Sequence, residues 1–203
     1  RQRQMCIRDR RYVPVTDGEL DLDAFRVALE GAKLVCVVHT SNVLGIRNPI
    51  EEIISISQKS GARVLIDAAQ AVPHEEIDFD KLGADFMAFS AHKMCGPTGI
   101  GALLVNESSF NEMEPFMGGG DMIETVTTEG STYQSNEHRF EAGTPRIAEG
   151  FGWAAALEWL ESVDLKSHHS RLLKIANRVA EELRSKGMKV YSSLRPGDAA
   201  VIS

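Results

Sequence analysis

The sequence predicts an α/β protein with a three-layer α/β/α arrangement, in which helices lie on both faces of a mostly parallel sheet. Residues 34–38 are five consecutive apolar residues, which is typical of a strand buried on both faces. Short apolar runs recur at about 63–67, 84–90 and 99–105, and segments with helical spacing or helix-capping residues separate the first three runs. Strands and helices that alternate in this way indicate parallel strands joined by helical connections. We therefore expect four strands of one sheet.

The helices are placed by capping residues and by the spacing of apolar residues. Asp21 can cap a short helix that follows it, and Pro49 and Gly61 mark the start and the end of a second one. Two longer helices are expected after residues 146 and 164, each with apolar side chains gathered on one face. Those side chains are Ala154, Leu157 and Leu160 in the first, and Leu172, Ile175, Val179 and Leu183 in the second.

The chain is expected to be an internal fragment with three parts. Residues 1–11 hold four arginines in the first ten positions and no apolar periodicity, so we expect a non-native leader there. Residues 12–160 form the larger domain, and its glycine-rich stretch after Asn106 is too long for an ordinary connection and is expected to be functional. Residues 161–203 begin a smaller C-terminal α+β domain, with a strand at 188–193.

Composition excludes several classes of partner. The net charge of −7 is spread over a mixture of acidic and basic residues, which argues against binding to nucleic acid or to an anionic membrane. No run approaches the roughly 20 apolar residues that a membrane span requires. Three widely spaced cysteines do not suggest a disulfide framework and favour a reducing compartment. We expect a cytoplasmic protein, or an organellar one if its parent carried a transit peptide.

Polar residues follow three of the expected strands. Ligands in open α/β sheets bind just beyond the carboxyl ends of the strands, so these residues are candidates for a shared site. They are His39, Thr40, Ser41 and Asn42 after the first strand, Asp67 and Gln70 after the second, and Ser90, His92 and Lys93 after the third.

Lys93 is the strongest candidate for chemistry because it lies between a strand and a glycine-rich loop. A lysine in a crevice can form a Schiff base with a carbonyl cofactor. Pyridoxal phosphate needs such a lysine, a carboxylate for its ring nitrogen and donors for its phosphate. Asp67, Ser90 and His92 supply the other two kinds of group, although a lone aspartate at a strand end is as often a cap of the following turn.

Three other interpretations of the same residues are weaker. The stretch GPTGIG lacks the lysine and hydroxyl residue of a phosphate-binding loop, and no helix follows it. A zinc site from Cys36, His39, His92 and Cys95 lacks the usual ligand spacing, and Cys36 in an apolar run is expected to be a packed hydrophobe. Cys95 as a nucleophile beside Lys93 is the third.

Five stretches together resemble a known family. HTSNVLG, LIDAAQAVPH, FSAHKMCGPTGIGALLV, FMGGGDMIETV and HRFEAGTPRIAEG are similar to the Suf-type (group II) cysteine desulfurases, in the class V aminotransferase branch of the pyridoxal-phosphate fold type I enzymes. The similarity runs from about Tyr12 to the end of the chain, in order and with compatible spacing.

The resemblance implies a role for each residue that matches the family's motifs. Lys93 would be the catalytic lysine that holds pyridoxal 5′-phosphate covalently, and Asp67 would pair with the nitrogen of the pyridine ring. Gln70 would bind the phenolic oxygen of the cofactor. Ser90 and His92 would bind its phosphate. No metal is implied.

The resemblance also implies partners and a reaction. Thr144 would reach the phosphate from the other subunit of a homodimer, and Asn42 would bind the carboxylate of the substrate, L-cysteine. Sulfur would pass to an enzyme cysteine as a persulfide, then to a Suf-type acceptor protein for iron–sulfur cluster assembly, and L-alanine would remain. The family's persulfide cysteine and substrate-binding arginine would lie beyond residue 203, and the group that stacks on the cofactor before residue 11. The fragment alone is therefore expected to be inactive.

Related activities remain open. Selenocysteine lyases, cysteine sulfinate desulfinases and other class V aminotransferases would use the same cofactor site. A noncatalytic dimeric relative that binds a sulfur acceptor is an alternative of a different class. The presence of Lys93 and Asp67 argues against it. Several relatives carry tyrosine at the place of Cys95, so the resemblance argues against this cysteine as the nucleophile.

Overall fold

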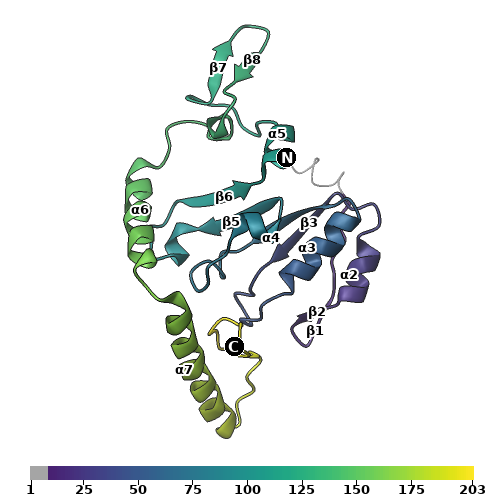
Figure 1. The fold of residues 1–203 in the computed structure, drawn as a ribbon, viewed down its shortest axis with the longest axis vertical. Helices are drawn as coiled ribbons and strands as arrows, with labels where there is room; N and C mark the ends of the chain where they lie inside the picture. Colours follow the sequence, from purple (N-terminus) through teal and green to yellow (C-terminus); the bar gives the residue numbers. More distant parts are fainter. Residues whose placement is uncertain (1–8) are drawn as a thin grey trace.

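The computed structural model describes residues 9–203, shown in Figure 1. Most of the expected leader, residues 1–11, lies outside this part of the chain, so its foreign origin stays a prediction. The first half contains β1 (Val15–Thr16), β2 (Glu19–Leu20), α2 (Leu22–Ala28), β3 (Leu34–Val38), α3 (Ile50–Lys59), β4 (Arg63–Asp67), α4 (Phe79–Leu82), β5 (Phe86–Ser90), the 3-10 turn η1 (Ala91–Lys93) and β6 (Gly101–Val105). The second half contains α5 (Glu107–Glu112), β7 (Ile123–Val126), β8 (Ser131–Tyr133), the 3-10 turn η2 (Glu137–Phe140), α6 (Ile147–Glu161) and α7 (Leu165–Ser185).

The four-stranded sheet is mostly parallel, as expected. Its strand order is β3-β4-β5-β6, with β3, β4 and β5 parallel and β6 antiparallel to β5. The helix caps are as expected too. The Asp21 carboxylate accepts hydrogen bonds from two backbone amides of α2, and Pro49 immediately precedes α3. The α/β class and the mixed, largely parallel sheet are therefore confirmed.

The main core lies between the sheet and α3. Ile50 and Ile54 of α3 pack on Val64 and Ile66 of β4 and on Met87 of β5, and all five side chains are buried. They meet because alternate residues of a strand face the same side, and because i and i+4 lie on one side of a helix. A second cluster joins α2 to α3, so α2, α3 and α4 cover one face of the sheet.

The opposite face of the sheet differs from the sequence expectation. Residues 34–38 are not buried on both faces: Val35 and Val37 contact the core, whereas Leu34 is 49% and Val38 41% exposed. Cys36 is exposed as well, which overturns its interpretation as a packed hydrophobe. The physical reason is that the other face of β3 has no helix against it within residues 9–203.

The glycine-rich stretch after β6 contains more regular structure than its composition indicates. The short helix α5 is capped by Asn106, whose side-chain oxygen accepts a hydrogen bond from the backbone amide of Ser109. The antiparallel β7–β8 hairpin then projects from the body of the molecule (Figure 1). The 3-10 turn η2 returns the chain to the foot of this hairpin before α6 begins.

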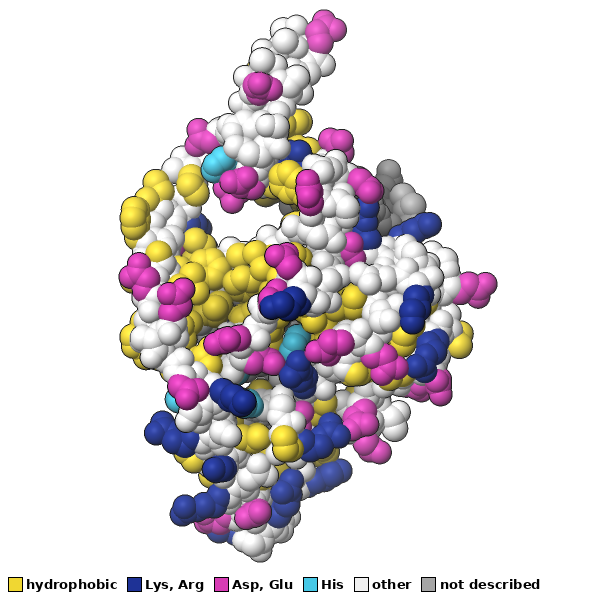
Figure 2. Space-filling model, in the orientation of Figure 1, with side chains coloured by type: hydrophobic (Ala, Val, Ile, Leu, Met, Phe, Trp, Pro, Cys, Tyr) yellow, Lys and Arg dark blue, Asp and Glu magenta, His cyan; other side chains and the backbone are white. Residues whose placement is uncertain are grey.

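The long helices α6 and α7 are more exposed than expected. No residue of α6 is buried, and Phe151 is 77% exposed. In α7 the buried residues are Ala176 and Ala180, which contact Leu194, whereas Ile175 and Val179 of the expected stripe are exposed. The buried stripe of α7 is thus rotated from the expected one, because small residues allow the C-terminal segment to lie close to the helix. Figure 2 shows hydrophobic side chains gathered over β5 and β6 beside α6.

The strand expected at residues 188–193 does not form. The Tyr191 amide makes one backbone hydrogen bond, of 2.7 Å, to the Ser203 carbonyl, and no ladder follows. The segment is fixed instead by the buried Asp198, which accepts hydrogen bonds from the backbone amides of Arg47 and Arg195. The boundary between a domain of residues 12–160 and one of 161–203 remains a prediction. None of the helices in the described part is long and apolar enough to cross a membrane.

Replacement of Ile53 tests the junction of α2 and α3. Ile53 is fully buried in the α2–α3 cluster. Because Ile53→Ala leaves a cavity there, we expect the free energy of unfolding to fall by about 2–5 kcal/mol in urea titrations. Ile175→Ala is the matched control, since Ile175 is 53% exposed on α7, and it should change stability by less than about 1 kcal/mol. Equal losses in the two variants would contradict this core assignment.

Candidate active site at the carboxyl ends of the parallel strands

The three parallel strands end side by side, so several candidate residues lie at one edge of the sheet. The amide of His39, just after β3, donates a 2.8 Å hydrogen bond to the carbonyl of Asp67 at the end of β4. The amide of Ala68 in turn donates a 2.9 Å bond to Ala88 of β5. Two residues after Ala88, β5 ends at Ser90 and continues directly into η1. The expected convergence of the strand ends is confirmed by these hydrogen bonds.

Asp67 is the carboxylate at the centre of this edge. It pairs in register with Val38 on one side and Ala88 on the other. Because Ile66 faces α3, Asp67 points to the opposite face of the sheet, the face that Ser90 shares by the same alternation. One carboxylate oxygen accepts a 3.0 Å hydrogen bond from the amide of Ala69. The turn-capping interpretation is thus correct for that oxygen, and the exposed side chain still presents its other oxygen to a ligand.

Lys93 is carried on a tight turn that immediately follows β5. The carbonyl of Ala91 accepts hydrogen bonds from the amides of Met94, at 2.8 Å, and Gly96, at 2.9 Å. Ala91 itself is fully buried and its amide bonds back to Ile100 at 3.2 Å, which ties the turn to the strand that leaves it. Lys93 is half-buried, so its amine is displayed from a fixed backbone rather than from a loose loop.

The helix α6 supports this turn from behind. A Cβ atom built on Gly96 would lie 3.0 Å from the Ala91 carbonyl oxygen and 3.0 Å from Cδ1 of Trp153 in α6. The Trp153 indole packs edge-on against the Phe89 ring, with centroids 5.9 Å apart. Its Nε1 is buried without a hydrogen-bond partner among the described residues. The glycine therefore allows an aromatic side chain to come within contact of the lysine turn.

Gln70 lies on the loop after β4, next to a small cavity of about 60 Å³. The cavity is lined by Thr40, Gln70, Ala71, His74, Glu75, His169, Gly197 and Ala199. The rings of His74 and His169 are 6.0 Å apart there, and burial together with the neighbouring His169 lowers the pKa of His74. The cavity joins the loop that carries Gln70 to α7 and to the C-terminal segment.

His39 is a buried, neutral residue that supports the site rather than a ligand-binding one. It is 1% exposed, and its Nδ1 lies 3.0 Å from the Thr40 hydroxyl oxygen. Burial, assisted by the charge of Arg47, lowers the pKa of His39 to about 4. Its Nδ1 is 3.6 Å from Glu75, but an uncharged imidazole forms no ion pair there; Glu75 pairs with Arg47 at 3.1 Å.

This network was missed from the sequence, because its members are far apart in the chain. The Arg47 amide donates to the carboxylate of Asp198, which is 151 residues away. Each of these residues has ordinary neighbours in the sequence, so no local pattern identifies the network. The one signal in the sequence is that His39 directly follows the apolar run at 34–38, where the strand ends.

The remaining predicted residues are placed but not brought together. Asn42 is exposed on the turn after β3, where the Ser41 hydroxyl accepts hydrogen bonds from the amides of Val43 and Leu44. His92 is exposed on η1. Thr144 is exposed on the segment before α6, a position that suits a contact outside its own chain. Their roles therefore stay predictions.

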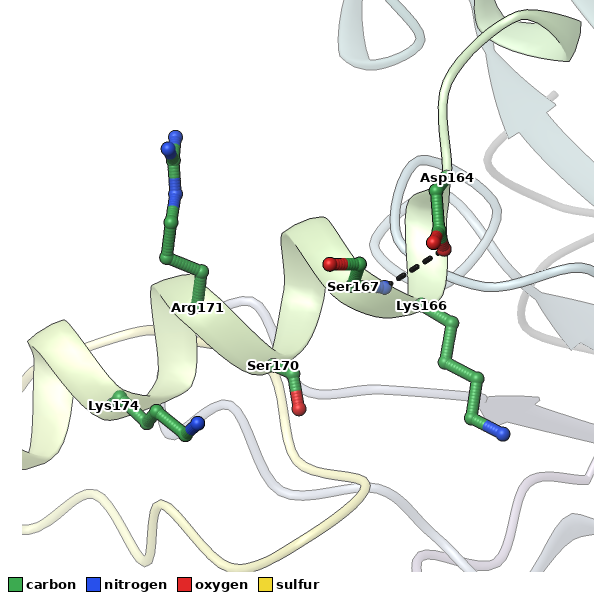
Figure 3. Close-up of a pocket in the computed structure, with 6 residues that line it drawn as sticks. All are labelled: Asp164, Lys166, Ser167, Ser170, Arg171 and Lys174. Atoms are coloured by element: carbon green, nitrogen blue, oxygen red, sulfur yellow. Dashed lines mark hydrogen bonds between the residues drawn. The ribbon is translucent and has the colours of Figure 1, made fainter.

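Metal and other ligand sites were also considered. In the described residues, no group of three or more His, Cys, Asp or Glu side chains is arranged to hold a metal ion, so the zinc alternative from Cys36, His39, His92 and Cys95 does not assemble. An open pocket of about 460 Å³ lies along α7 (Figure 3). There the Asp164 carboxylate already accepts a 2.9 Å hydrogen bond from the Ser167 amide, and its charge compensates the helix end. This pocket is separate from the strand ends.

Comparison with known proteins agrees with this geometry. A family model described as aminotransferase class-V matches residues 8–203. The chain belongs to this family. The resemblance noted in the sequence is thereby confirmed at the level of class V aminotransferases, whereas the Suf-type subgroup stays a prediction.

The similar class V relatives are described as cysteine desulfurases. A probable cysteine desulfurase of Streptomyces coelicolor is 49% identical over 150 residues, which are 73% of this chain and 36% of the relative. A cysteine desulfurase of Haloferax volcanii is 44% identical over 167 residues, 80% of this chain and 39% of the relative. The apo structure of a cysteine desulfurase from Thermococcus onnurineus NA1 is 38% identical, with a TM-score of 0.86 over 95% of this chain and 49% of that one. The chain spans less than half of each.

The buried imidazole predicts a pH dependence of stability. The pKa of His39 is about 4 in the fold and about 6.5 when unfolded, so the unfolded chain binds the extra proton between these values. The contribution of neutral His39 is present above pH 6.5 and is lost as the pH falls toward 4, by roughly 3 kcal/mol in total. Burial raises the pKa of Glu75, which changes stability with pH in the opposite direction. The pH dependence of the free energy of unfolding must therefore be compared with that of a variant.

The measurement is the free energy of unfolding from pH 7.5 to pH 4.5 for the unmodified chain and for His39→Asn. We expect the difference between the two to shrink as the pH falls, since asparagine does not titrate. A pH-independent difference would show that His39 is not held neutral by the fold.

A methyl group at Gly96 tests the contact between α6 and the lysine turn. Gly96→Ala places its Cβ within 3.0 Å of the Ala91 carbonyl oxygen and of Trp153, so the turn or the helix has to shift. We expect a loss of about 1–3 kcal/mol in the free energy of unfolding and altered Trp fluorescence. Gly118→Ala is the control, because no atom lies within 4 Å of its added Cβ. The contact is refuted if the two variants behave alike.

Proposed function

We propose that this chain is the cofactor-binding part of a pyridoxal-phosphate-dependent cysteine desulfurase, which removes sulfur from L-cysteine and leaves L-alanine. The observation that carries the proposal is Lys93 on a rigid turn at the end of β5, with the Asp67 carboxylate at the end of the adjoining β4. The similarity to cysteine desulfurases supports the reaction, since the relatives that match most of this chain carry that description.

The residues present fit pyridoxal phosphate. One Asp67 oxygen accepts a hydrogen bond from the Ala69 amide, which orients the carboxylate so that the other oxygen would accept a hydrogen bond from the protonated pyridine nitrogen. Ser90 faces the same side of the sheet as Asp67, where hydroxyl and imidazole donors from Ser90 and His92 would bind the phosphate. Ala88 separates Asp67 from Ser90, and this small side chain leaves room for a flat ring. When bound, the cofactor supplies an electron sink for the bond changes at the substrate.

The protein's own side chains would then bind the substrate and move the proton. The Lys93 amine would hold the cofactor at rest and, once released, take the proton from the α-carbon of the substrate as a general base. Gln70 would bind the phenolic oxygen of the cofactor, and Asn42 the carboxylate of L-cysteine. The turn of Lys93 keeps the amine near the sheet edge through the Ala91 hydrogen bonds, so positioning costs little entropy.

We also propose that the site is completed by a second copy of the chain. Thr144 lies immediately before α6, whose Ile147, Phe151 and Trp159 are exposed apolar residues, and such a surface is typical of a protein contact. In a homodimer this contact would present Thr144 to the cofactor phosphate of the other subunit. For the whole protein we further propose the persulfide step, a Suf-type acceptor, a role in iron–sulfur assembly and a cytoplasmic or organellar location. We propose that the isolated chain is inactive.

Replacement of Lys93 tests the proposal. We expect the purified chain to bind pyridoxal phosphate with a yellow absorbance, and borohydride reduction to attach the cofactor to the peptide that contains Lys93. Lys93→Ala should abolish this attachment, because it removes the lysine amine that η1 carries at the end of β5. Peptide mapping by mass spectrometry provides the measurement.

The matched control is Lys81→Ala, since the Lys81 side chain is 85% exposed and pairs with Asp78 on α4, away from the strand ends. It should bind the cofactor as the unmodified chain does. Cofactor that is still reduced onto the Lys93→Ala protein at a single site would overturn the assignment of Lys93.

A further inference from the structure

Arg139 packs against two aromatic rings that are themselves in contact. Its guanidinium carbon lies 4.2 Å from the centroid of the Phe110 ring and 4.7 Å from that of the Phe140 ring. The two rings meet edge to face, with centroids 5.4 Å apart and planes at 80°. Arg139 also donates a hydrogen bond from Nη2 to the carbonyl of Phe110. A cation over aromatic faces is attracted by their π-electrons, and more strongly when water is excluded.

The arginine is held there although its charge is incompletely satisfied. Its Nε is buried and has no hydrogen-bond partner in the described residues, and no carboxylate between residues 9 and 203 forms an ion pair with it. A buried donor without a partner costs stability, so the presence of Arg139 at this place requires an explanation. The cluster joins α5, which carries Phe110, to η2, which carries Arg139 and Phe140.

The chain beyond η2 is fixed as it runs toward Thr144. The Gly143 amide donates a 2.9 Å hydrogen bond to the Gly120 carbonyl. A Cβ on Gly119 would lie 3.0 Å from the Ala142 Cβ, so the two backbone segments are in close contact. Only three residues separate Arg139 from Gly143, and Thr144 comes next. Its position is therefore set by the Arg139 cluster on one side and by α6 on the other.

We propose that Arg139 is a positioning residue, which acts through its contacts with Phe110 and Phe140 to hold the Thr144 hydroxyl where it binds the phosphate of the cofactor. The inference rests on the proposed function for the role of Thr144. Arg139 itself touches neither cofactor nor substrate. The effect of Arg139 is selective, because displacement of Thr144 weakens binding of the phosphate and leaves the contacts to the pyridine ring unchanged.

The experiment compares pyridoxal phosphate with pyridoxal, which has the same ring and aldehyde but no phosphate. Dissociation constants are measured by absorbance titration for the unmodified chain, Arg139→Leu, Thr144→Val and the double variant. Leucine keeps apolar contact with the two rings and removes the guanidinium. We expect each single variant to bind pyridoxal phosphate about tenfold more weakly, as for the loss of one hydrogen bond to a charged group, and pyridoxal unchanged.

The double variant separates positioning from a merely additive effect. If Arg139 acts through Thr144, the double variant binds pyridoxal phosphate no more weakly than Thr144→Val alone. Arg178→Leu, on the exposed side of α7, is the control arginine and should bind both ligands normally. Arg139→Lys keeps the charge and part of the stem and should fall between the unmodified chain and Arg139→Leu.

Each other outcome contradicts the inference in a recognisable way. Equal weakening of both ligands by Arg139→Leu would indicate general damage, and additive losses in the double variant would indicate independent roles. The inference would also be overturned if Arg139→Leu bound pyridoxal phosphate as tightly as the unmodified chain does. If the unmodified chain binds neither ligand, the proposed function fails instead, which is a distinct result.

Discussion

The pairing of β4 between β3 and β5 is the constraint on which the rest of the structure depends. One hydrogen-bonded register sets Asp67 beside Val38 and Ala88, and it aligns the carboxyl ends of the three strands. The core side of the same strand, Val64 and Ile66, fixes which face α3 covers. Because side chains alternate along a strand, burial of these two residues obliges Asp67 to face the other way. The place of the carboxylate is therefore a consequence of packing on the far side of the sheet.

The lysine turn follows from this register through β5. Met87 anchors β5 in the same core, and the chain then has to reverse within a few residues to return as β6. The reversal uses small residues at its closest approaches, Ala91, Gly96 and Gly101, and α6 fills the space behind it. Lys93 on this turn therefore has a backbone fixed on three sides: by the strand before it, the strand after it and the Trp153 indole.

Much of the fold could be predicted from the sequence, for local physical reasons, and so could the candidate residues at the strand ends. Asp21 and Pro49 are helix-start residues whose effect acts over one turn, and the four strands are short apolar runs between turn residues. Lys93 and Asp67 are candidates because ligands in open α/β sheets bind just beyond the carboxyl ends of the strands. Tertiary packing decides the rest. The run at 34–38 is half exposed because helices cover only one face of its strand within residues 9–203. The segment at 188–193 forms no strand ladder in the described part of the chain, which its apolar residues do not reveal. The network of His39, Arg47 and Asp198 cannot be recognised in a local sequence window, because Arg47 and Asp198 are 151 residues apart.

The return of β5 into β6 also bears on the order in which the protein folds. Ser90 pairs with Gly101, so the lysine turn closes a loop of only about ten residues, and short loops close in roughly 10–100 ns at little cost in entropy. The contact of Trp153 with Gly96 spans more than five times that separation in sequence and must come later. We therefore expect the turn to exist first as a local hairpin and to become rigid only when α6 docks. The same residues would thus be flexible in a nascent chain and fixed in the finished one, so the completed helix packing, rather than the turn itself, governs when a cofactor can be held.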